Sequence, residues 1–281
     1  MSETQKQTPQ EEAGSLSKLM EDLFEPEKKE EKKAPAEKTA PPKDSGYRPH
    51  FPAVTLKEVS DDIPFQESMK TLRTNIEFSG AEDEVKVVCV TSALPNDGKS
   101  TISYNLARAF AESGKKTLLI DADMRKSVMR KQIVKAGGTS DGLSNFLVGR
   151  ASYEDSLCVT SVKNLYIMFA GTFPPNPSEL LGSARFRQLI DGVKKVYSVV
   201  VIDTPPIGSV IDAAVTAKVS DGLVLVLRSG SVSYRFAKRC REQLEATGTK
   251  ILGCVLNDVD MHSGKYYGNY YGKYYGAYYG K

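Results

Sequence analysis

The residues with the clearest chemical potential form the segment Ala-Leu-Pro-Asn-Asp-Gly-Lys-Ser at positions 93–100. Gly98 lets the backbone approach an anion closely, and successive N–H groups at the start of a helix carry partial positive charge. Lys99 can reach phosphate oxygens, and the Ser100 hydroxyl is an oxygen ligand of the kind that Mg²⁺ takes. The pattern predicts a phosphate-binding loop, or P-loop, for ATP and Mg²⁺, formed by these residues: Ala93, Asn96, Asp97, Gly98, Lys99, Ser100 and Thr101.

Three aspartates stand directly after apolar runs elsewhere in the chain. Asp121 and Asp123 follow residues 117–120, and Asp203 follows residues 199–202. The carboxyl ends of parallel strands are where ligands bind, and residues i and i+2 of an extended segment face the same side. Carboxylates beside a P-loop would position Mg²⁺ and accept a proton. The alternative is that these aspartates only cap strand ends; the nearby P-loop favours the functional interpretation.

The elements that must position these residues alternate between strands and helices. Continuous apolar runs, rather than alternating ones, are typical of strands that are buried on both faces of a parallel sheet. Helical patterns lie between most of these runs, and Gly114 ends the helix that follows the P-loop. The predicted fold class is α/β, a three-layer P-loop NTPase fold with a mainly parallel sheet. The candidate strands are residues 85–91, 117–120, 165–170, 199–202, 223–227 and 251–256.

The chain divides into three parts by composition. Residues 1–60 are rich in Glu, Lys, Pro and Ala, which predicts a disordered N-terminal arm, with one short amphipathic segment at 15–24. Residues 61–260 form the P-loop domain, and residues 261–281 form a tail. The domain should begin with a helix over 62–79. Its apolar face is predicted to contain Phe65, Met69, Leu72 and Ile76.

Composition argues against several classes of protein. The net charge of +3 and the lack of a basic run argue against a nucleic-acid-binding protein. The four cysteines form no Cys-x-x-Cys pair, so a zinc or iron–sulfur site is not expected. Cys89 and Cys254 lie in apolar runs and are expected to be reduced and buried. No apolar run is long enough to span a bilayer and no signal peptide is visible, so a cytoplasmic location is expected.

The tail has an unusual repeat. Four tandem units, each Tyr-Tyr-Gly plus one variable residue, hold eight of the fourteen tyrosines in the chain. Glycine at every fourth position opposes a helix, and so many tyrosines cannot all be buried in a short terminal segment. The tail should therefore present its phenols to solvent. They are Tyr266, Tyr267, Tyr270, Tyr271, Tyr274, Tyr275, Tyr278 and Tyr279.

The combination of motifs resembles the bacterial tyrosine kinases (BY-kinases) that serve capsule and exopolysaccharide synthesis. Residues 93–100, Asp121-x-Asp123-x-Arg125 and Asp203-x-x-Pro206 look like the Walker A, A′ and B motifs of that family. Residues 70–76, 142–147 and 171–181 also look like family segments, so the resemblance covers roughly residues 60–281. Each motif alone is shared with other P-loop ATPases, but the set is specific.

The resemblance implies an ATP-dependent protein-tyrosine kinase that autophosphorylates its C-terminal tyrosine cluster between protomers. Asp121 would be the proton acceptor, while Asp123 and Asp203 would orient Mg²⁺ together with Ser100. Lys99 would hold the ATP phosphates. Arg125 would stabilise charge on phosphate or on the acceptor. Asn257, at the end of the last strand, would lie at the adenine.

The resemblance also implies partners. The motif Glu67-x-x-Lys70-x-x-Arg73 matches the family's ring-assembly motif except at Lys70, which cannot make the bidentate contact of an arginine. The split form of the family has a separate transmembrane activator, a polysaccharide chain-length protein, which would recruit this cytoplasmic kinase to the inner face of the membrane. A protein-tyrosine phosphatase would reverse the modification.

Two other functions stay open from the sequence. One is a partitioning-type ATPase related to the septum-site proteins; these usually carry an extra lysine at the second P-loop position, where this chain has Leu94. The other is a non-catalytic interaction protein that uses an adhesive Tyr-Gly tail. Transfer of phosphate to tyrosine, rather than plain hydrolysis, would exclude the first, and Mg·ATP binding would argue against the second.

Overall fold

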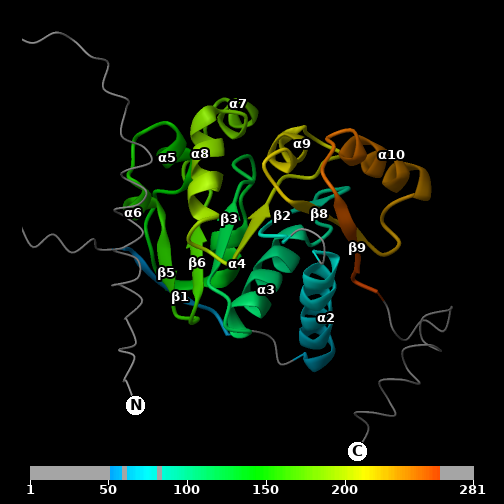
Figure 1. The fold of residues 1–281 in the computed structure, drawn as a ribbon, viewed down its shortest axis with the longest axis horizontal. Coiled ribbons are helices and arrows are strands. Elements are labelled where there is room, and N and C mark those ends of the chain that lie inside the picture. Colours follow the sequence, from blue (N-terminus) through cyan, green and yellow to red (C-terminus); the bar gives the residue numbers. More distant parts are fainter. Residues whose placement is uncertain (1–50, 59–61, 81–83, 260–281) are drawn as a thin grey trace, which may run out of the picture.

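The computed structural model describes residues 51–58, 62–80 and 84–259. The predicted arm up to residue 50, with its amphipathic segment, and the tyrosine-rich tail lie outside the described residues. Within the described part, nine strands form one sheet in the order β4-β1-β5-β6-β3-β7-β2-β8-β9 (Figure 1). The strands are β1 (Ala53–Leu56), β2 (Val87–Ser92), β3 (Thr117–Asp121), β4 (Val134–Gly137), β5 (Cys158–Thr160), β6 (Leu165–Met168), β7 (Val199–Asp203), β8 (Gly222–Arg228) and β9 (Ile251–Asn257).

The central part of the sheet is parallel, as predicted. Strands β6, β3, β7, β2, β8 and β9 pair in parallel, whereas β4 and β5 make antiparallel pairs with β1 and β6. All six predicted strands are present. The short strands β1, β4 and β5 were not predicted. Because β1 lies within the segment assigned to the disordered arm, the predicted boundary at residue 60 is wrong for residues 53–56.

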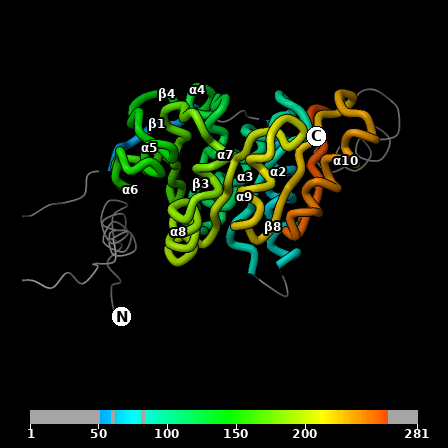
Figure 2. The backbone as a smooth tube through the Cα atoms, turned by 90° about the horizontal axis from the view of Figure 1, so that it is seen from above, coloured from blue at the N-terminus to red at the C-terminus, as the bar shows by residue number. Residues whose placement is uncertain are grey.

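Helices cover both faces of the sheet, which gives the three layers expected. They are α2 (Ile63–Ser79), α3 (Lys99–Glu112), α4 (Met129–Ile133), α5 (Leu143–Leu147), α6 (Tyr153–Ser156), α7 (Pro177–Leu181), α8 (Ala184–Val193), α9 (Asp212–Ala217) and α10 (Tyr234–Glu245). In Figure 2, α5 and α6 lie at one end of the molecule and α10 lies at the other.

Alternate residues of the central strands supply the two cores. Leu118 and Ile120 of β3 pack in the core on the side of α5 and α8, and Leu119 between them packs in the core on the side of α2 and α3. Both cores consist of buried apolar side chains, with some partly buried ones packed against them. A strand that contributes to both is buried on both faces, which explains its continuous apolar sequence.

Helix α2 packs on α3 through the predicted face. Met69 and Ile76 are buried, and Phe65 and Leu72 pack against the same core. Asp62 caps the helix by accepting a hydrogen bond from the Phe65 N–H.

One cysteine differs from expectation. Cys89 is buried in the central strand β2, but Cys254 is exposed because β9 is the edge strand of the sheet. An apolar run on an edge strand therefore does not imply burial of each of its residues.

Candidate active site

The P-loop connects β2 to α3, the arrangement that its sequence predicts. The loop leaves β2 at Ser92, and α3 begins at Lys99. Asn96 and Gly98 adopt positive φ angles of 67° and 95°, which glycine accepts without strain and asparagine tolerates better than most residues. The buried Asp97 carboxylate fixes the turn by accepting a hydrogen bond of 2.8 Å from the Leu94 N–H. The free N–H groups of the first turn of α3 follow directly and can bind an anion.

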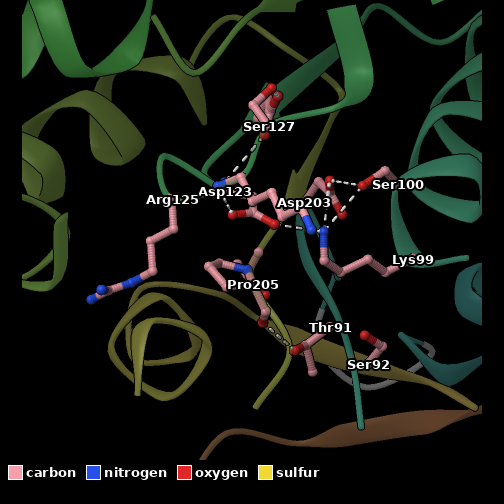
Figure 3. Close-up of polar contacts among 12 residues, drawn as sticks. Thr91, Ser92, Lys99, Ser100, Asp123, Arg125, Ser127, Asp203 and Pro205 are labelled. Atoms are coloured by element: carbon pink, nitrogen blue, oxygen red, sulfur yellow. Dashed lines mark hydrogen bonds and ion pairs between the residues drawn. The ribbon is translucent and has the colours of Figure 1, made fainter. Parts of the chain in front are cut away.

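Lys99 and Ser100 lie in contact with two of the predicted aspartates (Figure 3). The Lys99 Nζ is 2.8 Å from the Asp123 Oδ2 and 3.7 Å from the Asp203 Oδ2. The Ser100 hydroxyl donates a hydrogen bond of 2.6 Å to the Asp203 Oδ2. All four side chains are buried. The structure therefore brings the P-loop together with the carboxylates at the ends of β3 and β7.

Asp121 lies beside this cluster at the end of β3. It is fully buried and is the register partner of Asp203 on β7. Its Oδ1 accepts a hydrogen bond of 3.1 Å from the Asp123 N–H, and its Oδ2 accepts one from the Ser127 hydroxyl. Burial raises the pKa of the Asp121 carboxyl to about 8, and the neighbouring Asp203 charge adds to that increase. A carboxylate with a raised pKa is a stronger base than an ordinary aspartate.

The charges in the cluster affect one another. Burial opposes the charge of Lys99, but the carboxylates of Asp203 and Asp123 outweigh it and raise the pKa of the lysine. Burial also raises the pKa of Asp203, although Lys99 and the Ser100 hydroxyl oppose this. Lys99 thus stays charged in a site that contains three carboxyl groups. A cation that entered would relieve the mutual repulsion of the carboxylates.

The donor set fits Mg²⁺ bound with a nucleotide rather than a closed metal site. In the part of the chain that the structure describes, no group of three or more His, Cys, Asp or Glu side chains is arranged to hold a metal ion. The Ser100 hydroxyl and the Asp203 carboxylate nevertheless lie side by side, and both offer oxygen atoms of the kind that Mg²⁺ binds. Mg²⁺ typically takes one or two protein oxygens and completes its shell with water and phosphate oxygens.

Arg125 is placed differently from the other predicted site residues. In Figure 3 its side chain points away from Lys99 and Ser100. Its Nε and one Nη donate hydrogen bonds of 2.8 and 3.1 Å to the two oxygens of the fully buried Asp212, at the start of α9. The same Nη donates a hydrogen bond of 2.9 Å to the Ser178 hydroxyl on α7. Arg125 therefore joins the loop after β3 to α7 and α9, and its predicted role at the phosphate stays a prediction.

Asn257 contacts the P-loop directly. Its Nδ2 donates a hydrogen bond of 2.9 Å to the Asp97 carbonyl. A Cβ at position 98 would lie 2.1 Å from that Nδ2, so only glycine fits there. The end of β9 is thus held against the loop, and the predicted contact of Asn257 with adenine stays a prediction. Of the other predicted nucleotide-site residues, Ala93 is buried at the start of the loop, while Asn96 and Thr101 are exposed.

The predicted assembly motif lies on α2. Lys70 pairs with Glu67 at 2.7 Å. The charge of Arg73 suggests a position on the solvent-exposed face of α2. Instead, its Nη1 donates a hydrogen bond of 3.1 Å to the Ala109 carbonyl on α3. The predicted role of the three residues in a ring interface stays a prediction.

Several residues of the site were missed from the sequence. The Ser103 hydroxyl, one turn after Lys99, donates a hydrogen bond of 3.0 Å to the Asp203 Oδ1. Because Ser103 lies one helical turn after Lys99 on the same helix, its position in the sequence could have indicated that it lies at the site. Ser127, Ser178 and Asp212 had no such signal, since their positions depend on how distant loops meet.

A P-loop between a central parallel strand and a helix, with carboxylates at the ends of the neighbouring strands, defines a P-loop nucleotide-binding protein. Comparison with protein families matches residues 85–247 to the AAA domain. The tyrosine-protein kinase CpsD of Streptococcus agalactiae is 44% identical over 201 residues, which cover 72% of this chain and 86% of that protein. The chain belongs to the bacterial tyrosine kinase family and is a protein-tyrosine kinase.

Solved structures agree with this assignment. The chimerical protein CapA2B2 superposes with a TM-score of 0.67 and 35% identity, over 73% of this chain and 93% of that chain. The kinase domain of the Escherichia coli tyrosine kinase ETK gives a TM-score of 0.66 and 31% identity, over 74% and 85%. These relatives favour the kinase over the partitioning-type ATPase and the non-catalytic interaction protein.

Proposed function

We propose that this kinase transfers the γ-phosphoryl group of Mg·ATP to tyrosines of its own C-terminal tail and serves capsule or exopolysaccharide synthesis. The observation that carries the proposal is the buried cluster of Lys99, Ser100, Asp123 and Asp203, with Asp121 beside it. It combines a phosphate-binding cation, oxygen ligands for Mg²⁺ and a carboxylate of raised pKa.

Each residue has a defined part in the transfer. Lys99, released from Asp123, would neutralise the β- and γ-phosphate oxygens, and the N–H groups at the start of α3 would bind the remaining charge. Ser100, Asp123 and Asp203 would hold Mg²⁺, which neutralises charge between the two phosphates. A tyrosine phenol, with a pKa of about 10, enters protonated at neutral pH. Its oxygen would form a bond to the γ-phosphorus as the bond to the bridging oxygen of ADP breaks. The positive charge of bound Mg²⁺ would keep the Asp121 carboxyl ionised at neutral pH, so that it can accept the phenol proton.

The acceptor is proposed to be the tail of another protomer. The eight tail tyrosines lie outside the described residues, so this part depends on the repeat in the sequence. The tail follows β9 closely in the sequence, and Asn257 at the end of β9 contacts the P-loop. We assign Glu67, Lys70 and Arg73 of α2 to the ring interface that would bring protomers together.

A membrane partner is proposed to activate and recruit the kinase. No helix among the described residues is long and apolar enough to cross a membrane. We propose that the cytoplasmic part of a transmembrane chain-length protein binds the kinase at the inner face of the membrane. Activity should be low for the kinase alone and higher with that fragment, and a protein-tyrosine phosphatase should reset the tail.

Phosphotyrosine mass spectrometry tests the proposal. The purified chain is incubated with Mg·ATP, with and without the cytoplasmic fragment of a candidate activator, and the tail peptides are analysed. Phosphotyrosine in the tail that depends on Mg²⁺ and increases with the fragment supports the proposal. Nucleotide hydrolysis without phosphotyrosine would overturn it in favour of a plain ATPase.

A further inference from the structure

The tyrosines of the described domain differ sharply in exposure. Five tyrosines lie in the described residues, and Tyr234 at the start of α10 is 83% exposed. The other four are no more than 6% exposed, and they are Tyr104, Tyr153, Tyr166 and Tyr197. In a protein-tyrosine kinase, Tyr234 is therefore the one phenol of the described domain that a second active site can reach without unfolding.

The surroundings of Tyr234 suit a phosphorylated side chain. Helix α10 carries four basic residues and two acidic ones. Arg235, next to Tyr234, is exposed and forms no ion pair with any described residue. Lys238, one turn further on, makes only a long pair of 3.8 Å with Glu242. A phosphate at Tyr234 would gain the Lys238 cation at i+4, which lies on the same face of the helix, and the positive charge of Arg235 lies nearby.

Tyr234 also lies close to the point where the chain enters the tail. The Ser229 N–H donates a hydrogen bond of 2.8 Å to the Asn257 carbonyl. Arg228 Nε donates one of 2.8 Å to the Asp258 carboxylate. The loop that leads into Tyr234 is thus joined to the last residues before the tail. Tyr266 follows Asp258 by only eight residues in the sequence. An active site that receives the first tail tyrosines is therefore near Tyr234.

We propose that Tyr234 is a second phosphoacceptor site, modified by the active site of another copy of the chain. The inference rests on the kinase function proposed above. The Tyr234 oxygen forms a bond to the γ-phosphorus of ATP, the bond to the bridging oxygen breaks, and ADP leaves. The phenol proton passes to Asp121 of the copy that acts as the enzyme. The product carries a charge of about −1.5 to −2 beside Arg235 and Lys238, which compensate it.

The test uses the full chain with all eight tail tyrosines changed to phenylalanine. This chain and the same chain with the additional change Tyr234→Phe are incubated with Mg·ATP. The enzyme is a Tyr234→Phe chain with an intact tail, so that the Tyr234 peptide comes from the acceptor alone. Cleavage after Arg228 and Arg235 releases residues 229–235, in which Tyr234 is the sole tyrosine. Fragment spectra then separate phosphate on Tyr234 from phosphate on the neighbouring serines. We expect phosphate on Tyr234 in the tail-substituted chain and at least a tenfold loss of phosphotyrosine in the peptide of residues 229–235 with Tyr234→Phe.

The buried tyrosines provide the matched control. Phosphate on peptides that contain Tyr153 or Tyr197 would show that unfolded chains are the acceptor, and would overturn the inference. An unmodified Tyr234 beside a phosphorylated wild-type tail would overturn it while the kinase function stands. No phosphotyrosine in either chain would overturn both. Tail phosphorylation of a Tyr234→Phe chain with an intact tail should match wild type, because Tyr234 has no part in the transfer itself.

Discussion

The Lys99 ammonium lies 2.8 Å from the Asp123 carboxylate, so a buried ion pair joins the P-loop to the loop after β3. The lysine that we propose as the phosphate ligand is thus held by protein carboxylates. Exchange of one anion for another keeps the buried charge paired in both states. This arrangement places Lys99, Asp123 and Asp203 where the phosphates and Mg²⁺ would enter.

Replacement of Lys99 by methionine should abolish transfer. The change removes the cation that faces the phosphates, for which a loss of at least roughly 100-fold in rate is expected. Phosphotyrosine yield measures the effect, and circular dichroism shows that the chain is folded. Lys86→Met, at a partly exposed lysine paired with Glu84, is the matched control and should retain the wild-type rate. Normal phosphotyrosine from folded Lys99→Met protein would remove the P-loop from its assigned role.

Asp121→Asn should separate binding from chemistry. The amide is of nearly the same size but cannot accept a proton at neutral pH, so transfer should decrease by roughly 10²- to 10⁴-fold. Affinity for Mg·ATP, measured by calorimetry, should change little.

The contrasting variant is Asp203→Asn, which should instead raise the Mg²⁺ concentration that half-maximal activity requires. Unchanged single-turnover transfer in Asp121→Asn would show that another group accepts the proton.

The raised pKa of Asp121 predicts a pH-dependent effect on stability in metal-free protein. The folded carboxyl, with a pKa of about 8, keeps its proton at pH values where the unfolded one, with a model value of 3.8, has lost it. The contribution of Asp121 to the free energy of unfolding therefore decreases as the pH rises from about 4 to about 8. Asp121→Asn lacks this pH-dependent contribution to the free energy of unfolding. Its melting temperature relative to wild type should therefore rise over that range by at least about 2 °C, which corresponds to about 1 kcal/mol in the free energy of unfolding. Asp191→Asn, at an exposed carboxyl on α8, is the matched control substitution.

Arg125 and Asp212 should be coupled in stability. Arg125→Ala leaves the fully buried Asp212 carboxylate with a hydrogen bond from the Ser178 hydroxyl but without its charged partner, at a cost of about 2 kcal/mol. Asp212→Ala together with Arg125→Ala should cost less than the sum of the single changes, because the double change leaves no unpaired charge. Urea unfolding measures each value, and Arg150→Ala at an exposed position is the control. Strict additivity would show that the pair does not hold the loop after β3.

The sequence predicted the central elements because their signals are local. Residues 117–120 are apolar on both faces, and the aspartates that follow them mark the strand end. The P-loop motif specifies a strand, a turn with glycine and a helix within a short stretch. Side chains at the carboxyl ends of neighbouring parallel strands lie close together because of the topology of the sheet. This is why the sequence predicted that Asp123 and Asp203 lie beside Lys99 of the P-loop.

Other features depend on contacts between distant segments and left no local signal. Strand β1 pairs with β4 and β5 through only a few residues each. A strand so short has no periodic pattern to distinguish it from the arm before it. The position of Arg125 is a similar case, since its motif places it beside the site. Its long side chain turns instead to Asp212, a residue 87 positions away in sequence.

The last prediction concerns the tail and the assembly of protomers. Twenty-two residues separate Asn257 from Tyr279, and a Gly-rich coil of that length has a typical reach of roughly 25 Å. That reach would let the tail enter a neighbouring site in a ring. Lys265, Lys273 and Lys281 make the unmodified tail basic, but eight phosphotyrosines, each adding about −1.5 to −2 charge, would make it strongly anionic. Modified tails would repel one another and the three carboxylates of the site, so the assembly should open as phosphate accumulates.

Two measurements check this prediction. Lys99→Met protein with an intact tail serves as the acceptor, and active protein with its eight tail tyrosines changed to phenylalanine serves as the enzyme. Phosphate should appear on the tail of the inactive acceptor, because transfer occurs between chains. Light scattering should then report smaller particles for the phosphorylated wild type than for the same sample after phosphatase treatment, and added salt should reduce the difference by screening the charges. An unmodified acceptor would exclude transfer between protomers, whereas equal particle sizes would exclude release driven by charge.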